Sequence, residues 1–171
     1  MREYIIYHAD RLRMLHENQD VIPNDQGYSR MGEVYAHAIR HKNLPDMSKA
    51  ELREYHAESV RSSPTFHGRP SRLRCIFAAN TIEEAAWFGN SIEPKPETRI
   101  PIYEAFASNF CTLDMVWLDY DCDANLFLQY CRRYWYGEIS GHTPIVGARK
   151  TPRLEVLVPL PARIGKLVGY A

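Results

Sequence analysis

A single carboxylate interrupts an apolar run near the C-terminal end of the chain. The run reads Pro-Arg-Leu-Glu-Val-Leu-Val-Pro from Pro152 to Pro159. Leu and Val in such density, closed by proline, are typical of a strand that is buried on both faces. An ionised carboxylate is costly there unless it is paired or used in chemistry. Glu155 therefore has two interpretations: a strand-end glutamate that reaches solvent or an arginine such as Arg153, or a functional group.

Apolar periodicity and capping patterns predict a mixed α/β architecture around this strand. Helices are expected at 10–17, 31–41, 48–62, 81–88 and 123–135, several of them opened by a capping residue, namely Asp10, Ser48, Thr81 and Asp123. Further strands are expected at 4–8, 73–78, 99–107 and 162–168. The last of these is expected to pair with the Glu155 strand across Pro159-Leu160-Pro161.

Length, charge and the N-terminal residues limit the class of protein. The chain has 171 residues, which suits one domain spanning 1–171. Its 21 Lys and Arg balance 21 Asp and Glu, so no overall field draws it to a polyanion or an anionic membrane. No signal-peptide core and no membrane-spanning run is visible. A cytoplasmic protein with no membrane partner is expected, with secretion by a route that needs no cleaved signal left open.

The four cysteines are expected to be small buried hydrophobic residues in a reducing compartment. Cys75, Cys111, Cys122 and Cys131 form no Cys-x-x-Cys pair and lie mostly in apolar segments. No disulfide framework is predicted.

Three strands carry the residues that could form a site. His8 ends the first predicted strand, Phe77 lies in the strand after Pro70-Ser71-Arg72, and Glu155 lies in the penultimate one. Tyr7-His8, Phe77-Ala78-x-x-Thr81-x-x-x-Ala85 and Leu154-Glu155-Val156-Leu157-Val158 resemble the three sequence blocks of the ADP-ribosyltransferase superfamily. Their order matches the His, aromatic, Glu arrangement of its diphtheria-toxin-like and PARP-like branch.

Two further likenesses support the same family. The Glu155 block is similar to that of DNA-targeting ADP-ribosyltransferase toxins of toxin–antitoxin modules. Pro70-Ser71-Arg72 through Phe77-Ala78, with Tyr134-Trp135-Tyr136-Gly137, resembles a bacterial family of unassigned function that is grouped with this superfamily. The resemblance implies an α+β fold with a split, mostly antiparallel β-sheet and flanking helices, and NAD as co-substrate without a metal.

The resemblance also implies roles for individual residues. Glu155 would be catalytic, since cleavage of the nicotinamide bond develops positive charge on a ribose that a fixed carboxylate stabilises. His8, next to Tyr7, would hydrogen-bond the adenosine-side ribose through a neutral, oriented imidazole. Ser71-Arg72 would approach the pyrophosphate, with the guanidinium as a planar fork.

The aromatic residue that stacks on nicotinamide is left open at this stage. Phe77, Phe88, Trp135 and Tyr136 are the candidates, and ordinary core packing is the alternative for each. Arg153 stands two residues before Glu155, where relatives that modify arginine commonly carry a second Glu, so arginine is not the favoured acceptor.

Other patterns compete with this interpretation. Glu138, in the aromatic Tyr134–Glu138 segment, is a possible target-binding or second carboxylate, with a solvated loop residue as the default. His37 and His41 are four apart on a helix but lack the Glu of HExxH. Cys75 with His142 is a formal nucleophile and base, although a thiol in an apolar strand is usually inert.

Two clusters of basic residues could flank one cleft and bind NAD phosphates or a nucleic-acid strand. The alternative is that both clusters are ordinary solvated surface. They are Arg69, Arg72 and Arg74, and Arg149, Lys150 and Arg153.

The expected function is NAD-dependent mono-ADP-ribosyl transfer to a macromolecule, which is protein, DNA or RNA. A bacterial toxin, effector or defence factor is the expected biological role, with an antitoxin or target protein as partner. An NAD glycohydrolase and a non-catalytic module that binds a nucleotide or partner remain as alternatives.

Overall fold

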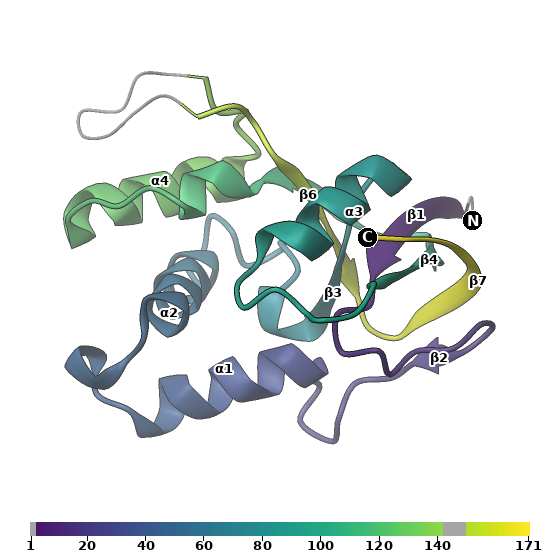
Figure 1. Ribbon diagram of the computed structural model, residues 1–171. Coiled ribbons are helices and arrows are strands. Elements are labelled where there is room, and N and C mark those ends of the chain that lie inside the picture. The colour runs from purple at the N-terminus through teal and green to yellow at the C-terminus, as the bar shows by residue number, and fades with distance from the viewer. Residues whose placement is uncertain (1–2, 142–149) are drawn as a thin grey trace.

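A computed structural model describes residues 3–141 and 150–171 of the chain (Figure 1). Its strands are β1 (Tyr4–Ala9), β2 (Asp20–Val21), β3 (Cys75–Ala78), β4 (Pro101–Ala107), β5 (Cys111–Asp114), β6 (Leu154–Pro159) and β7 (Ala162–Tyr170). Its α-helices are α1 (Arg30–His41), α2 (Lys49–Arg61), α3 (Ile82–Ser91) and α4 (Ala124–Tyr136). Short 3₁₀ turns are η1 (Leu44–Asp46), η2 (Arg72–Arg74) and η3 (Met115–Leu118).

The strands form two antiparallel sheets, in the orders β1-β4-β7-β2 and β3-β6-β5. The expected α+β class with a split, mostly antiparallel sheet is therefore confirmed. In Figure 1, α2 and α4 lie beside the three-stranded sheet, and α3 lies beside the four-stranded one. The described residues contain no helix that combines the length and the apolar character needed to cross a bilayer.

The two sheets meet at a fork between β1 and β3. Tyr7 and Ala79 exchange backbone hydrogen bonds of 2.9 and 2.8 Å. Continuing this antiparallel register would pair Ala9 with Phe77, but the bridge between Tyr7 and Ala79 is isolated, and Ala9 remains paired only with Ile102 of β4 on its other edge. The strand β1 therefore leaves β3 one residue after Tyr7, at His8.

Each helix begins at a residue whose side chain accepts a free backbone N–H, which explains why the helix starts were predictable. Ser48 and Glu51 form a complete capping box at α2, with Glu51 accepting from the Ser48 N–H at 2.7 Å. The caps of the other helices are Ser29, Thr81 and Asp123.

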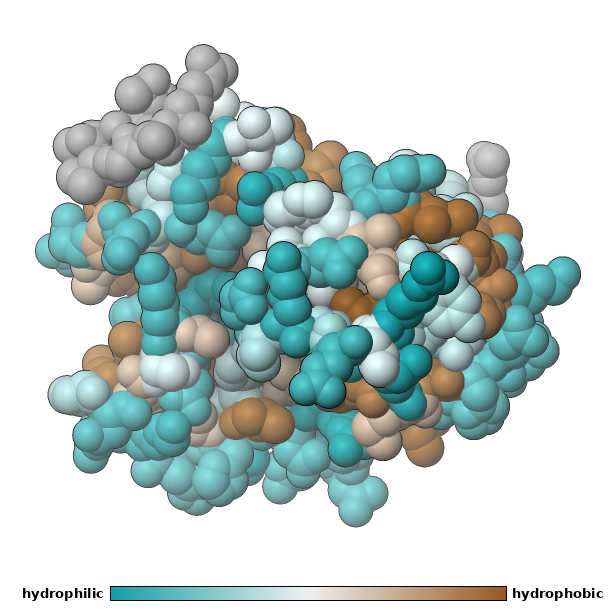
Figure 2. Space-filling view, viewed as in Figure 1, coloured by the Kyte–Doolittle hydropathy of each residue, from teal (hydrophilic) through white to brown (hydrophobic). Residues whose placement is uncertain are grey.

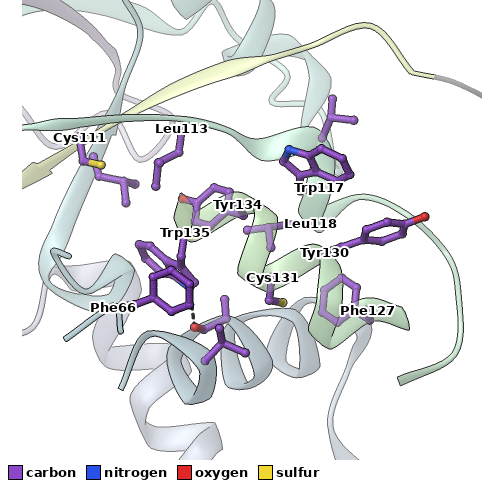
Figure 3. Close-up of a cluster of buried hydrophobic side chains, with 14 of the residues drawn as sticks. Phe66, Cys111, Leu113, Trp117, Leu118, Phe127, Tyr130, Cys131, Tyr134 and Trp135 are labelled. Atoms are coloured by element: carbon purple, nitrogen blue, oxygen red, sulfur yellow. Dashed lines mark hydrogen bonds between the residues drawn. The ribbon is translucent and has the colours of Figure 1, made fainter. Parts of the chain in front are cut away.

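The main core lies between the three-stranded sheet and the pair α2 and α4. Figure 3 shows the α4 side chains Tyr134 and Trp135 pointing toward Leu113 and Phe66. The indole N–H of Trp135 donates to the Ala57 carbonyl at 2.8 Å, which ties α4 to α2. These large side chains are fully buried, so this layer holds the helices in place over β6.

A second core joins the two sheets themselves. It combines residues of the four-stranded sheet (Ile6, Tyr103, Ala105, Ala107, Ala162, Ile164) with residues of the three-stranded one (Ala78, Val156, Val158). On the surface, Figure 2 shows mostly hydrophilic residues on the face in view, with hydrophobic ones gathered near β1. Tyr4 and Ile5 of β1 are among the exposed hydrophobic residues.

Three sequence-based expectations about elements are wrong, and one strand was missed. No helix forms over 10–17; the Asp10 carboxylate instead accepts the N–H groups of Met14 and Leu15, both at 2.7 Å, and closes a turn. β7 does not pair with β6, because β3 and β5 already occupy both edges of β6, and β7 lies between β4 and β2. α3 continues past Gly89 to Ser91, and strand β5 was not predicted.

Candidate functional site

The guanidinium of Arg72 lies between two buried carboxylates. Its Nε and Nη2 bind Glu54 of α2 at 2.8 and 3.2 Å, and its Nη1 binds Oε1 of Glu155 on β6. Each of the three residues is 5% exposed or less. The first interpretation of Glu155, pairing with an arginine, therefore holds, but the arginine is Arg72 and not Arg153.

Tyr134 of α4 completes the arrangement. Its hydroxyl accepts from Nη1 of Arg72 at 2.6 Å and donates to Oε1 of Glu155 at 2.6 Å. The Arg72 guanidinium also lies over the Phe77 ring, 4.7 Å from its centroid. Residues from α2, η2, β3, α4 and β6 thus fix the orientation of a single carboxylate.

The charges of this cluster support one another. Burial alone would raise the pKa of Glu54, but the charge and hydrogen bonds of Arg72 outweigh it, so the pKa of Glu54 is lowered. Burial opposes the charge on Arg72, yet Glu155 and Glu54 raise its pKa well above the usual value. Burial also raises the pKa of Tyr134 well above its usual value, so its hydroxyl stays protonated and can donate.

The two oxygens of Glu155 have different environments. Oε1 receives both Arg72 and Tyr134, whereas no donor among the described residues binds Oε2. In contrast, both oxygens of Glu54 are occupied by Arg53 or Arg72. Among the described residues, Glu155 is therefore held through one oxygen only.

His8 lies at the fork between the sheets. Its Nδ1 is 2.7 Å from the Phe77 carbonyl oxygen, which would accept from a backbone N–H if the register of β1 and β3 continued. Because a carbonyl can only accept, Nδ1 carries the proton and Nε2 keeps its lone pair. Burial lowers the pKa of His8, with the Phe77 bond and Asp10 acting in the opposite direction. The ring is thus neutral with a fixed tautomer.

Phe77 connects His8 to Glu155. The Phe77 carbonyl accepts a hydrogen bond from His8, and the Arg72 guanidinium lies over the Phe77 ring. On β6, the strand partner of Phe77 is Leu157, which lies two residues from Glu155 on the same face. Strand alternation puts Tyr7, and not His8, on this face. His8 reaches Phe77 because β1 turns away at the fork.

Four other predicted residues lie apart from this cluster. Tyr7 packs with Ala79 and residues of α3. Trp135 is fully buried in the α2–α4 core, and Tyr136 is exposed at the edge of Phe66 with ring centroids 4.8 Å apart. Ser71 turns away from its neighbour Arg72, and its hydroxyl donates to Glu58 at 3.0 Å.

The remaining candidates also lie elsewhere. Phe88 packs edge-on to Trp87, and the exposed carboxylate of Glu138 pairs with Arg133 at 2.7 Å. The ring centroids of His37 and His41 are 4.5 Å apart with the rings tilted by 45°, and no group of three or more potential metal ligands occurs in residues 3–141 and 150–171.

Burial raises the pKa of the Cys75 thiol to about 12, which fits the inert interpretation. Cys111 and Cys131 are buried as expected, whereas Cys122 is only partly buried. His142 and Arg149, which belonged to the cysteine and cleft hypotheses, lie outside the described residues.

Sequence reasoning missed Glu54 and the role of Tyr134. The buried face of α2 carries Glu54 together with Ala57 and Val60. The signal was the spacing of Glu54 with Ala57, because a glutamate three residues before a buried alanine shares its side of the helix.

No family model matches the sequence, and no curated protein matches it at a significant level.

Proposed function

We propose that the chain is an NAD-dependent mono-ADP-ribosyltransferase that acts in the cytoplasm on a macromolecular acceptor. The observation that carries this proposal is the environment of Glu155: one oxygen is held by Arg72 and Tyr134, and no residue in 3–141 or 150–171 donates to the other. A carboxylate fixed in this way suits the stabilisation of positive charge that develops on a ribose.

The residues suit the two ends of NAD. Oε2 of Glu155 would face the nicotinamide-side ribose, where it would orient a hydroxyl and stabilise positive charge as the glycosidic bond breaks. Nicotinamide leaves with the bonding electron pair, and a nucleophile of the acceptor forms the new bond to the same carbon. Of the four aromatic candidates named from the sequence, Phe77 is the one whose ring lies against the Arg72 guanidinium, so it is the best candidate to stack on nicotinamide.

His8 would serve the adenosine-side ribose. Its Nδ1–H is occupied by the Phe77 carbonyl, so Nε2 is left to accept a hydrogen bond from a ribose hydroxyl. The lowered pKa keeps the ring neutral at physiological pH, as this role requires. Arg72 would position Glu155 and not bind pyrophosphate, since each of its three nitrogens already donates to Glu54, Glu155 or Tyr134.

The burial of Glu155 favours one alternative. Glu155 is 5% exposed, so little of its surface can contact a ribose. This degree of burial would suit a module that binds a nucleotide or a partner without catalysis. A glycohydrolase, in which water replaces the acceptor, uses the same residues. Within the main proposal, a bacterial toxin, effector or defence factor is the role we favour, with protein, DNA or RNA as acceptor and an antitoxin as a possible partner.

The test compares NAD cleavage by the wild type, Glu155→Gln and a control, Glu83→Gln, whose carboxylate is exposed on α3. Labelled NAD is incubated with each protein and host lysate, with protease or nuclease treatment in parallel. Thermal unfolding of each variant establishes that it is folded at the assay temperature.

We expect Glu155→Gln to lose at least about 100-fold in NAD turnover, as is common when a charge-stabilising group is removed, and Glu83→Gln to match the wild type. Label lost with protease identifies a protein acceptor, and label lost with nuclease identifies nucleic acid. Free ADP-ribose without labelled product would identify a glycohydrolase. Intact NAD with the wild type, or undiminished turnover by folded Glu155→Gln, would refute catalysis at Glu155.

A further inference from the structure

A pocket lies on the other side of the Ser71-Arg72 turn from Glu155. It has a volume of about 360 Å³, is open to solvent on one side and is lined by α1, α2, η2 and the loop before α1. Its lining residues are Tyr28, Ala36, Ile39, Arg40, Glu58, Arg61, Ser71, Leu73 and Arg74. Arg72 points to Glu155 while Ser71 and Arg74 line this pocket, so the two sites share a backbone segment but not their side chains.

Two arginines of the pocket have no carboxylate partner among the described residues. Arg40 and Arg74 are both exposed, and their guanidinium carbons lie 5.8 and 5.5 Å from the centre of the Tyr28 ring. Arg40 donates to the Ala36 carbonyl and to Gln26, both at 3.1 Å, and no described residue accepts from its Nη1. For Arg74, no acceptor occurs among residues 3–141 and 150–171.

The third arginine of the pocket is already neutralised. Arg61 binds Glu58 through Nε and Nη2, with distances down to 2.7 Å, and Ser71 donates to the same carboxylate. The lining thus keeps two uncompensated positive charges, on Arg40 and Arg74. Two positive charges match a dianion, and planar guanidinium forks suit phosphate oxygens.

The remaining walls suit an organic group attached to that anion. Ala36, Ile39 and Leu73 contribute apolar surface between α1 and η2. The pocket volume falls in the range of sites for small organic ligands and exceeds what an inorganic ion needs.

Glycines allow the close packing that shapes the pocket. Gly27 has a φ of +81°, and a Cβ there would meet Nη1 of Arg74 at 3.1 Å. The Asn24 side chain accepts from the Tyr28 N–H at 2.8 Å and so closes the loop beneath Arg74. On α1, a Cβ at Gly32 would lie 1.8 Å from the Leu73 carbonyl oxygen. The walls are therefore set by backbone packing before any ligand arrives.

We infer that this pocket binds a small phosphate monoester, such as a nucleoside 5′-monophosphate, with the phosphate on Arg40 and Arg74 and the organic group against the apolar wall. The site is separate from Glu155 and does not depend on NAD cleavage.

Isothermal titration of the full chain with AMP, inorganic phosphate and adenosine tests this inference. The variants are Arg40→Gln and Arg74→Gln, with Arg132→Gln as the matched control, an exposed arginine on α4 outside the pocket. Because Arg40 and Arg74 are exposed, we expect these variants to keep the wild-type unfolding temperature.

We expect AMP to bind more tightly than phosphate, and adenosine to bind weakly or not at all. Each pocket variant should weaken AMP binding about tenfold or more, whereas Arg132→Gln should leave it unchanged. No binding up to about 1 mM AMP would overturn the inference. Equal affinity in the wild type and both pocket variants would also overturn it, since AMP would then occupy another site. Neither result would bear on NAD turnover.

Discussion

Replacement of Arg72 by methionine would leave two carboxylates buried around an apolar side chain. Glu54 and Glu155 are 2 and 5% exposed, and Arg72 is the cation that binds both. Methionine retains much of the length of arginine and its packing on Phe77, so the substitution removes mainly charge and hydrogen bonds.

The magnitude follows from the burial of the pair. Removing one partner of a buried ion pair costs about 3–5 kcal/mol, because the remaining charge stays desolvated. In a chain of this length a loss of 1 kcal/mol lowers the unfolding temperature by roughly 2–4 °C. Arg72→Met should therefore lower it by roughly 6–20 °C at neutral pH.

The loss of stability in Arg72→Met should depend on pH, and the direction of this dependence follows from the pKa of Glu54. In the wild type the pKa of Glu54 is lowered, so the stability it contributes is complete above its unfolded value of 4.5 and is lost as pH falls through the folded value. Without Arg72, burial raises the folded pKa, and the variant loses stability as pH rises above the unfolded value. The difference between wild type and variant should therefore be larger at pH 7 than at pH 5.

Urea unfolding followed by circular dichroism at pH 5 and pH 7 measures both effects. The matched control is Arg53→Met, because Arg53 also binds Glu54, at 3.1 Å, but is 28% exposed. The control should lose less than about 1 kcal/mol, as is typical of partly exposed pairs. A loss below about 1 kcal/mol for Arg72→Met, or an equal loss at both pH values, would refute the reasoning.

Three further substitutions test the described packing. Gly32→Ala should lower the free energy of unfolding in urea by about 1–3 kcal/mol or more, since its Cβ would lie 1.8 Å from a backbone oxygen. The control Gly68→Ala, with open space around it, should change this free energy by less than about 0.5 kcal/mol. Tyr134→Phe should cost about 1–3 kcal/mol by the same measurement, because it removes the hydroxyl that links two buried ions; an unchanged midpoint would contradict that link. His8→Asn should reduce the loss of stability between pH 7 and pH 5, since burial lowers the pKa of His8 and the unfolded chain takes up the proton more readily. An equal reduction by His16→Asn, at an exposed histidine, would show that His8 is not the source.

Local signals made the helices predictable. Ser48, Thr81 and Asp123 each cap a helix within one or two residues of the predicted start. A capping hydrogen bond involves residues two or three apart, so it is visible in a sequence window. Asp10 shows the limit of this signal, because its carboxylate accepts from backbone N–H groups four and five residues later and closes an isolated turn instead of capping a helix.

Pairing between distant strands was less predictable. The short Pro159–Pro161 connection suggested a hairpin, but both edges of β6 are taken by β3 and β5, which come from far earlier in the chain. Glu54 was missed for a similar reason. A glutamate on a helix is exposed by default, and only the three-dimensional position of Arg72, 18 residues later, makes its burial favourable.

The fork between the sheets has a consequence for the response of the protein to cold. One backbone pair, Tyr7 with Ala79, and the His8 imidazole provide the hydrogen bonds described between β1 and β3, while apolar side chains such as Ile6 and Val156 fill the rest of the seam. The stabilisation that comes from apolar burial falls on cooling, whereas a ladder of backbone hydrogen bonds depends less on apolar burial. The seam, and with it the spacing between His8 and Glu155, should therefore be the part of the sheet that loosens first at low temperature.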